Sequence, residues 1–415
     1  EQDLCDRTGS LFEVTNKVVL FDLTNFTFEG SKEGSQKAQY GRPKNKRIDC
    51  KQIVLALAIN TEGFVRYSAL LPGNTADPKA LPGMVDDIVS VNPVACGTED
   101  RILVVIDAGI ATEDNLKLLS DRGYDYLCVS RTPLKDYALS PDGRTVTVHD
   151  NLDREIKLEE VDHAAGGDYY LKVTSPAKAY TQESMNRVYR QKFEDAMLAI
   201  KGSLTRKGGT KRYEAVIQRV GRTIQKYPSV AKFYDIEYVR SERDGKLMGD
   251  VRWTPKASLE NVEQTFGTYF LRTNRGNLDE ATTWDYYNTI RDIEEANRQI
   301  KTDLNLSPIY HQTDGNTDAH LFMGLVSYWI VNTIRHFLKI NEQYKEVNHY
   351  WTELVRIMST QKAITTKAVN ALGEKVSIRM CSDPTADVAR IYEALGYRST
   401  PFKKYTIIEE DPPPE

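Results

Sequence analysis

Apolar residues gather in short runs over the first third of the chain, and helical patterns separate these runs. A strand is expected from Lys17 to Phe28, because β-branched and aromatic residues dominate that stretch. Two further runs, 52–59 and 64–71, predict a pair of strands joined at 60–63. The next elements expected are a helix over about 78–89, a buried strand over 102–106, a helix from Thr112 and a strand over 124–129. This order predicts an α/β fold, with a mixed sheet covered by helices.

The pattern changes after Arg131. Polar segments interrupted by Gly and Asp continue to Arg275, with short strand-like pieces at 144–149 and 169–173. Two basic helical stretches are expected within them, 181–200 and 211–226. We interpret this region as a mostly β insertion domain rather than a continuation of the first sheet.

Helical periodicity returns from Glu280 to about Lys345, and the stretch 321–338 is apolar enough for a buried core helix. A last amphipathic helix is expected over 386–395, and the acidic, proline-rich tail 409–415 is expected to be disordered. The division that follows is 1–131 as the first part of a catalytic core, 132–276 as the insertion with its basic helices, 277–345 as the second part of the core, and 346–415 as a helical C-terminal region.

Composition is that of an ordinary globular protein: of 415 residues, 40% are hydrophobic and 27% charged. No apolar run approaches the roughly 20 residues that cross a membrane, so a cytoplasmic protein is expected. The five scattered cysteines form no CxxC pair, which argues against a zinc site. The net charge of −4 argues against a uniformly basic nucleic-acid binder, yet the stretch 187–232 holds twelve Lys or Arg against three acids. That local excess of nine positive charges favours contact with a DNA backbone.

Candidate chemistry begins at the ends of two apolar runs, where Asp22 and Asp107 stand. A carboxylate at the end of a buried strand is costly unless something pairs with it, and a divalent cation is one such partner. A third carboxylate comes from the helix expected over 287–304. At 100° per residue, one stripe of this helix faces the core (Ile290, Ile293, Ile300, Leu304), and a neighbouring stripe carries Tyr287, Glu294, Arg298 and Lys301. Glu294 is therefore the expected third acid, and Glu295 the solvated one.

Three such carboxylates suit two Mg²⁺ or Mn²⁺ ions, which activate an attacking hydroxyl and stabilise a leaving oxygen in an in-line displacement. Arg298 and Lys301, on the same face as Glu294, are expected to contact phosphates that flank the scissile one. Paired carboxylates also serve glycosidases, but basic residues beside Glu294 fit phosphate better than sugar.

Several motifs carry a family resemblance as a set, in matching order and spacing from about Lys17 to Lys339. They are Asp22–Gly30, Gly41–Pro43 with Asp49–Gln52, Leu71–Thr75, Val105–Gly109, Glu294–Lys301 and Pro308–His311. This set resembles the DDE transposases of bacterial insertion sequences, and within them the group with a β-rich insertion before the catalytic glutamate.

The resemblance implies an RNase H-like core, as in retroviral integrases, with Asp22, Asp107 and Glu294 as catalytic metal ligands. In this group the glutamate helix carries a Tyr-x2-Arg-x3-Glu-x6-Lys signature. Tyr287, Glu294 and Lys301 match it, whereas Ile290 occupies the arginine position and Arg291 stands next to it. The residues expected to contact DNA are Tyr287, Arg291, Arg298 and Lys301, together with Arg206, Lys207, Lys211 and Arg212 from the basic stretch.

The resemblance also implies the reaction and its partners. A DNA transposase nicks double-stranded DNA at transposon ends and joins the freed 3′ hydroxyl to target DNA. Because two ends are held together, a homodimer in the active complex is implied, and a nucleoid-associated bacterial protein is expected. A stand-alone RNase H-like nuclease and an inactive DNA-binding relative stay open as alternatives: the long insertion argues against the first, and the presence of all three acids against the second.

Overall fold

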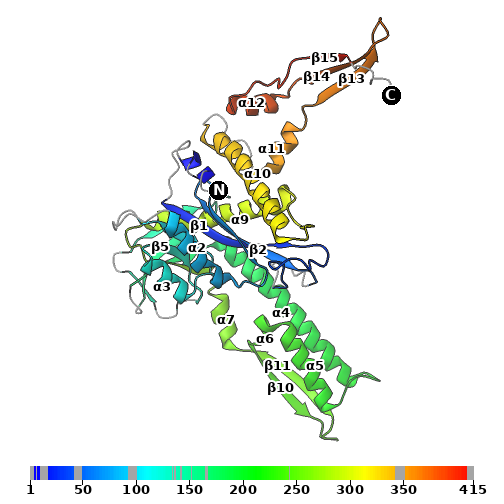
Figure 1. Cartoon of the computed structure of the whole chain (residues 1–415). Coiled ribbons are helices and arrows are strands. Elements are labelled where there is room, and N and C mark those ends of the chain that lie inside the picture. The colour runs from blue at the N-terminus through cyan, green and yellow to red at the C-terminus, as the bar shows by residue number, and fades with distance from the viewer. Residues whose placement is uncertain are drawn as a thin grey trace. The chain divides into compact units, whose positions relative to one another are not determined.

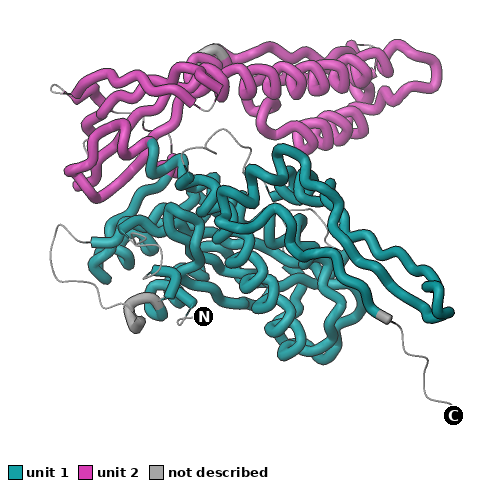
Figure 2. The backbone as a smooth tube through the Cα atoms, turned by 90° about the horizontal axis from the view of Figure 1, so that it is seen from above, with its two compact units in different colours: residues 1–128, 285–415 teal, residues 129–284 magenta. Residues whose placement is uncertain are grey.

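The computed structural model describes most of the chain. It covers residues 4–5, 7–9, 17–41, 49–91, 101–132, 134, 137–140, 143–150, 152–163, 167–242, 244–341 and 351–408. The predictions for Arg42 and Pro43 of the family motif and for the acidic tail 409–415 lie outside these residues. The chain forms two compact units, which Figure 2 colours separately: unit 1 is 1–128 with 285–415, and unit 2 is 129–284.

A mixed sheet forms the centre of unit 1, in the strand order β3-β2-β1-β4-β5. β1 lies between an antiparallel neighbour, β2, and a parallel one, β4; β3 pairs antiparallel with β2, and β5 pairs parallel with β4. The strands are β1 (Val18–Thr27), β2 (Gln52–Asn60), β3 (Val65–Pro72), β4 (Leu103–Ile106) and β5 (Asp125–Val129). The predicted α/β fold with a mixed sheet flanked by helices is confirmed, and it is consistent with an RNase H-like transposase domain.

Helices cover both faces of this sheet. Alternate residues of β1 (Val19, Phe21, Leu23) pack with α2 (Asp77–Val91) and α3 (Glu113–Asp121) in one apolar cluster. The intervening residues, which include Asp22, lie on the opposite face, because successive side chains of a strand alternate. α9 (Ile290–Arg298) packs against β1 there. Asp22 therefore lies on the face of the sheet that α9 covers.

α10 (Asp314–Ile340) is anchored to the turn between β2 and β3. The Tyr328 hydroxyl donates a 2.8 Å hydrogen bond to the Gly63 carbonyl, and the Asn332 amide donates one of 3.0 Å to the Glu62 carbonyl. The expected core helix is buried on one face only, since Met323, Ile330 and Ile340 are about 60% exposed (61%, 60% and 58%).

The helix that carries Glu294 is divided, contrary to the single helix expected over 287–304. α8 (Glu280–Asn288) ends before Thr289, α9 follows, and a π-helical turn, η1 (Gln299–Asp303), completes the segment. The Thr289 hydroxyl donates a 2.5 Å hydrogen bond to the carbonyl of Tyr286. In a continuous helix this carbonyl would accept the backbone amide of Ile290 instead. Tyr287 therefore belongs to a different helix from Glu294.

The sequence predicted a helical C-terminal region, but this part of unit 1 also contains strands. α11 (Trp351–Met358) and α12 (Ala386–Ala394) pack with Leu338 of α10. A three-stranded antiparallel sheet accompanies them, formed by β13 (Ala363–Val369), β14 (Lys375–Cys381) and β15 (Tyr405–Ile408). The sequences of these three strands contain too few apolar residues for the strands to be predicted from the pattern.

Unit 2 combines strands with long helices, so it is less β-rich than expected. Its strands β12-β9-β8-β6 neighbour one another in that order, β7 pairs with β8, and β10 pairs with β11. The strands are β6 (Tyr137–Leu139), β7 (Thr145–His149), β8 (Glu155–His163), β9 (Tyr169–Thr174), β10 (Tyr234–Arg240), β11 (Met248–Pro255) and β12 (Thr268–Thr273). The helices are α4 (Pro176–Thr205), α5 (Tyr213–Lys226), α6 (Pro228–Ala231) and α7 (Ala257–Glu263). A core of its own, which includes Phe193, Met197, Val216 and Val251, joins α4, α5 and the β10–β11 hairpin (Figure 1).

Candidate active site

The strand register brings Asp22 and Asp107 to neighbouring positions. β1 and β4 run parallel with Phe21 opposite Ile106, and Asp22 and Asp107 are the residues that come next along the chain. Asp107 directly follows β4, as expected. Asp22 lies inside β1, in agreement with the strand expected over Lys17–Phe28; the strand continues beyond the apolar run that ends at Asp22 because Leu23, Phe26 and Thr27 are again apolar or β-branched.

Asn297 connects Asp22 to the helix of the third acid. Its side-chain amide donates a 3.0 Å hydrogen bond to a carboxylate oxygen of Asp22, while its own carbonyl oxygen is buried without a hydrogen-bond partner. Glu294 lies one helical turn before Asn297 on α9, and it is exposed. Thus α9, the helix that carries Glu294, packs against the strand that carries Asp22.

Sequence reasoning overlooked Asn297, although a signal was present. Asn297 falls in the middle of the core stripe defined by Ile290, Ile293 and Ile300, and it is only 5% exposed. A polar residue inside an apolar stripe indicates a specific contact, because a buried side-chain amide is normally hydrogen-bonded to a partner.

Glu295 is not the solvated acid that the helical stripe suggested. It is half-buried, and Arg298 donates to both of its oxygens at 2.8 and 2.6 Å. These hydrogen bonds hold the pKa of Glu295 below its usual value, against the effect of burial. Arg298 also reaches Asp303 at 3.2 Å. The guanidinium is thus engaged by two carboxylates, and its contact with a phosphate stays a prediction.

The surroundings of Asp107 contain a second carboxylate that the sequence did not single out. A Cβ atom added to Gly109 would lie 3.5 Å from Oδ2 of Asp107 and 3.9 Å from Oδ2 of Asp77. Asp77 is the first residue of α2, a position where a helix favours negative charge. Stabilisation of the start of α2 therefore explains the presence of Asp77 as well as a role in the candidate site does.

The signature residues are distributed around the glutamate. Lys301, in η1, places its ammonium group 5.6 Å from the ring centre of Phe26, which shares a face of β1 with Asp22. Arg291 is exposed, whereas Ile290, at the position of the signature arginine, is 9% exposed and part of the core. Tyr287 is half-buried on α8. The structure thus places Lys301 over the face of β1 that carries Asp22 and leaves Arg291 on the surface.

The donor chemistry of this region fits hard divalent cations. Carboxylates and amide carbonyls are the ligands that Mg²⁺ and Mn²⁺ prefer, and the buried Asn297 oxygen is an acceptor without a donor next to Asp22. The three acids do not form a ready ligand set, however. Among the residues that the structure describes, no group of three or more His, Cys, Asp or Glu side chains is placed to hold a metal ion.

The four basic residues expected to contact DNA from unit 2 lie together in one loop. Arg206 ends α4 and Arg212 precedes α5, with Lys207 and Lys211 between them. Arg206, Lys207 and Arg212 are exposed. Elsewhere in the basic stretch, acids from other segments offset the charge: Lys201 pairs with Asp250 at 2.8 Å and Arg190 with Glu263 at 3.2 Å. The loop holds four of the twelve basic residues of the stretch within seven positions.

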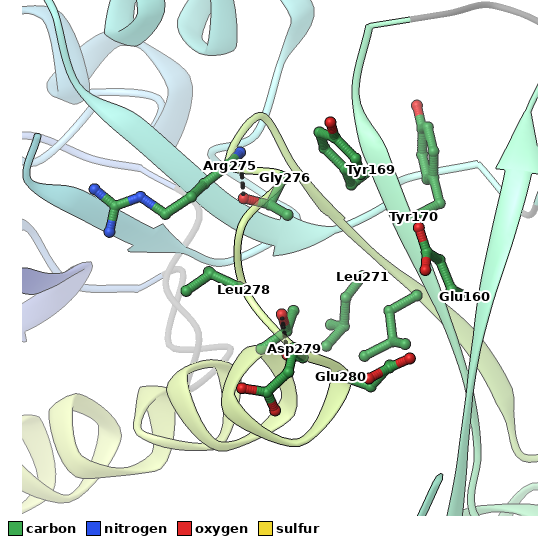
Figure 3. Close-up of a pocket in the computed structure, with 12 residues that line it drawn as sticks. Glu160, Tyr169, Tyr170, Leu271, Arg275, Gly276, Leu278, Asp279 and Glu280 are labelled. Carbon is green, nitrogen blue, oxygen red and sulfur yellow. Dashed lines mark hydrogen bonds between the residues drawn. The ribbon is translucent and has the colours of Figure 1, made fainter. Parts of the chain in front are cut away.

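Unit 2 also contains a pocket of about 200 Å³ that holds none of the predicted site residues. Figure 3 shows its wall of Tyr169, Tyr170 and Leu271 opposite the segment from Arg275 to Glu280. The ring of Tyr169 packs so closely on Gly276 that an added Cβ would lie 2.0 Å from it. A larger residue at position 276 would force the Tyr169 side chain, which is 47% exposed, to move aside.

Comparison with known proteins identifies the family. The sequence model of the family described as "Transposase DDE domain" matches residues 15–330, which includes all three candidate acids. The chain belongs to this family. No curated protein matches the chain. Within the part of the chain described, no helix combines the length and apolar character needed to span a membrane.

Proposed function

We propose that the protein is a metal-dependent DNA transposase that cleaves at transposon ends and transfers the freed strand into target DNA. Membership of the transposase DDE family and the adjacent positions of Asp22 and Asp107 support this proposal. The observation that carries it is the hydrogen bond from Asn297 to Asp22, since it ties the strand of one acid to the helix of another.

In this proposal Asp22, Asp107 and Glu294 are the catalytic acids and hold two Mg²⁺ or Mn²⁺ ions. When bound, the ions supply positive charge to the attacking and leaving oxygens of an in-line phosphoryl transfer. Asn297 orients Asp22, and Lys301 presents positive charge to a phosphate on the same face of the sheet. One site can perform both cleavage and joining, because each step displaces one oxygen at phosphorus.

The assembly follows from the same proposal. The core is an RNase H-like catalytic domain, built from the parts before and after an insertion that unit 2 represents. The Arg206–Arg212 loop, with Lys207 and Lys211, contacts the DNA backbone, as do Tyr287, Arg291, Arg298 and Lys301. Two DNA ends must be held together, so two copies of the chain act in one complex.

A plasmid that carries the coding sequence with its flanking DNA tests the proposal. The protein is incubated with it in Mg²⁺ or Mn²⁺, and the products are separated by electrophoresis. Excised and rejoined DNA supports a transposase, cleavage without joining indicates a nuclease, and binding alone indicates an inactive relative. Either of the last two results would refute the proposed strand transfer.

Matched substitutions assign the residues. Asp22→Asn, Asp107→Asn and Glu294→Gln are each expected to reduce cleavage by at least about a thousandfold, because each removes a carboxylate that would hold a metal ion. Glu295→Gln is the control, since Glu295 neighbours Glu294 but pairs with Arg298. Full cleavage by any of the three acid variants would show that the assignment is wrong.

A further inference from the structure

A carboxylate outside the three candidate acids shares a space with Asp107. Asp77 is the first residue of α2, and Asp107 follows β4. A Cβ atom added to Gly109 would lie 3.5 Å from Oδ2 of Asp107 and 3.9 Å from Oδ2 of Asp77. Among the described residues, no other heavy atom comes within 4 Å of that position, apart from those of the glycine and its two chain neighbours. The two carboxylates therefore border one space beside Gly109.

Neither carboxylate has a protein partner in the described part of the chain. The side chains of Asp77 and Asp107 form no hydrogen bond and no ion pair there. An acid that caps a helix start accepts backbone N–H groups of the first turn, and Asp77 accepts none of those described. Two carboxylates that face one space repel each other, and a cation between them removes this repulsion. The arrangement favours a metal-binding role over stabilisation of the start of α2 alone.

A second observation indicates that this edge of the sheet binds a ligand. Oδ1 of Asn297 is a buried acceptor without a hydrogen-bond partner, on a residue that is only 5% exposed. The amide nitrogen of the same side chain bonds Asp22, whose place in the register of β1 corresponds to that of Asp107 after β4. A buried oxygen that no donor satisfies fits a cation or the water around it.

We propose that Asp77 is a fourth carboxylate of the metal site and holds, through a water molecule, the divalent cation that Asp107 binds directly. Mg²⁺ usually keeps several waters and takes only one or two carboxylates. A chain of carboxylate, ion, water and carboxylate spans up to roughly 7 Å, which is close to the largest separation that the two distances to position 109 allow. The inference rests on the proposed function for the role of Asp107 and adds one residue to it.

The same arrangement explains the glycine at position 109. Gly109 does not have a positive φ, so its backbone conformation does not require glycine. A side chain there would instead occupy the space that Asp77 and Asp107 share, at van der Waals distance from both oxygens. We therefore expect a methyl group at position 109 to hinder the hydrated ion while the fold is kept.

Binding of Mn²⁺ to the full chain without DNA tests the proposal independently of catalysis. The electron paramagnetic resonance signal of free Mn²⁺ falls as the ion binds, so it measures the affinity. Asp77→Asn should weaken Mn²⁺ binding about tenfold, the lower end of the range for loss of an outer-shell partner. The matched control, Asp114→Asn, removes an exposed acid from the first turn of α3 and should change the affinity little. Equal affinity in Asp77→Asn and the unsubstituted chain overturns the proposal, as does a chain that binds no Mn²⁺ at millimolar concentrations.

Melting temperatures supply a second measurement that tolerates a less stable variant. Mn²⁺ should raise the Tm of the unsubstituted chain, because a ligand that binds the folded state stabilises it. This rise should shrink in Asp77→Asn and in Gly109→Ala, whatever the Tm of each variant without metal. It should persist in Gly83→Ala, where an added Cβ meets nothing within 4 Å. An undiminished rise in Asp77→Asn overturns the proposal.

Asp107→Asn separates this inference from the proposed function. If Asp107→Asn abolishes Mn²⁺ binding while Asp77→Asn leaves it intact, the role of Asp77 is wrong and that of Asp107 stands. If Mn²⁺ binding depends on both aspartates but the plasmid assay yields no strand transfer, the metal-binding role of Asp77 is supported and the proposed function is refuted.

Discussion

The side-chain amide of Asn297 donates a 3.0 Å hydrogen bond to the carboxylate of Asp22, and so joins α9 to β1. The bond connects the helix of one candidate acid with the strand of another. In the proposed mechanism Asn297 is thus a positioning residue, which acts on the reaction through Asp22.

Replacing Asn297 by leucine, which has a similar volume, should lower the rate of DNA cleavage at least about tenfold and raise the Mg²⁺ concentration for half-maximal cleavage, because Asp22 loses the group that orients it. Both quantities are measured on the same DNA. Gln299→Leu is the matched control, since Gln299 is a buried amide on the same helical segment that bonds Glu295 instead. An unchanged Mg²⁺ dependence in Asn297→Leu would count against the positioning role.

Ile290 stands where the family signature has arginine, and its burial predicts what restoring the arginine would do. Ile290→Arg should lower the free energy of unfolding by about 2–4 kcal/mol, because it forces a guanidinium into the core. Urea denaturation measures this loss. If Ile290→Arg kept the original free energy of unfolding and also bound DNA more tightly, the buried position of Ile290 in the structure would be contradicted.

The neighbouring Arg291 is exposed and can supply the missing charge. Arg291→Ala should leave the free energy of unfolding within about 0.5 kcal/mol of the original. It should weaken DNA binding and lower the slope of log affinity against log salt by about one, as expected for one phosphate contact. Fluorescence anisotropy at several salt concentrations measures both, and an unaltered slope would exclude the contact.

Asp292 makes stability depend on pH in a predictable direction. Burial raises its pKa above the usual 3.8, and the positive charges of Lys339 and Arg335 only partly oppose this. A carboxyl group whose pKa is raised by folding stabilises the fold while protonated, and the contribution is lost as the pH rises through the raised value. Asp292→Asn should therefore raise the Tm at pH 7, and the gain should shrink as the pH falls through the raised pKa and be lost below the usual value of 3.8.

Melting curves across this pH range measure the effect. The exposed Glu33→Gln is the control and should change the Tm little at either pH. A lower Tm for Asp292→Asn at pH 7 would mean that its attraction to Lys339 and Arg335 outweighs the cost of burial.

The loop of unit 2 provides a test of the DNA surface. Replacing its four basic residues, Arg206, Lys207, Lys211 and Arg212, by alanine should lower the salt slope of DNA binding by up to about 3.6, since each phosphate contact contributes about 0.9. The same number of changes in the C-terminal region is the control: Lys362, Arg398, Lys403 and Lys404 to alanine. Equal loss in both variants would show only a general effect of charge.

Much of the fold followed from local pattern. β1, β2 and β3 were predicted within about one or two residues, because short runs of apolar, β-branched and aromatic residues mark strands. The start of α3 was predicted from Thr112, whose hydroxyl accepts the Asn115 amide at 3.3 Å. The break at Thr289 and the strands of the C-terminal sheet escaped prediction, since a single hydroxyl bond and pairing between distant segments decide them.

The sequence by itself determined the family, the α/β class and the identity of the candidate acids, since these depend on residue types in a fixed order. It could not decide the neighbours of each acid. The periodicity predicted the burial of Ile290, but the half-buried position of Glu295 with its Arg298 partner and the bond from Asn297 to Asp22 are seen only in the folded chain. Periodicity gives the face of a helix to within a broad sector, and only packing fixes which side chain on that face meets a partner from 275 residues away.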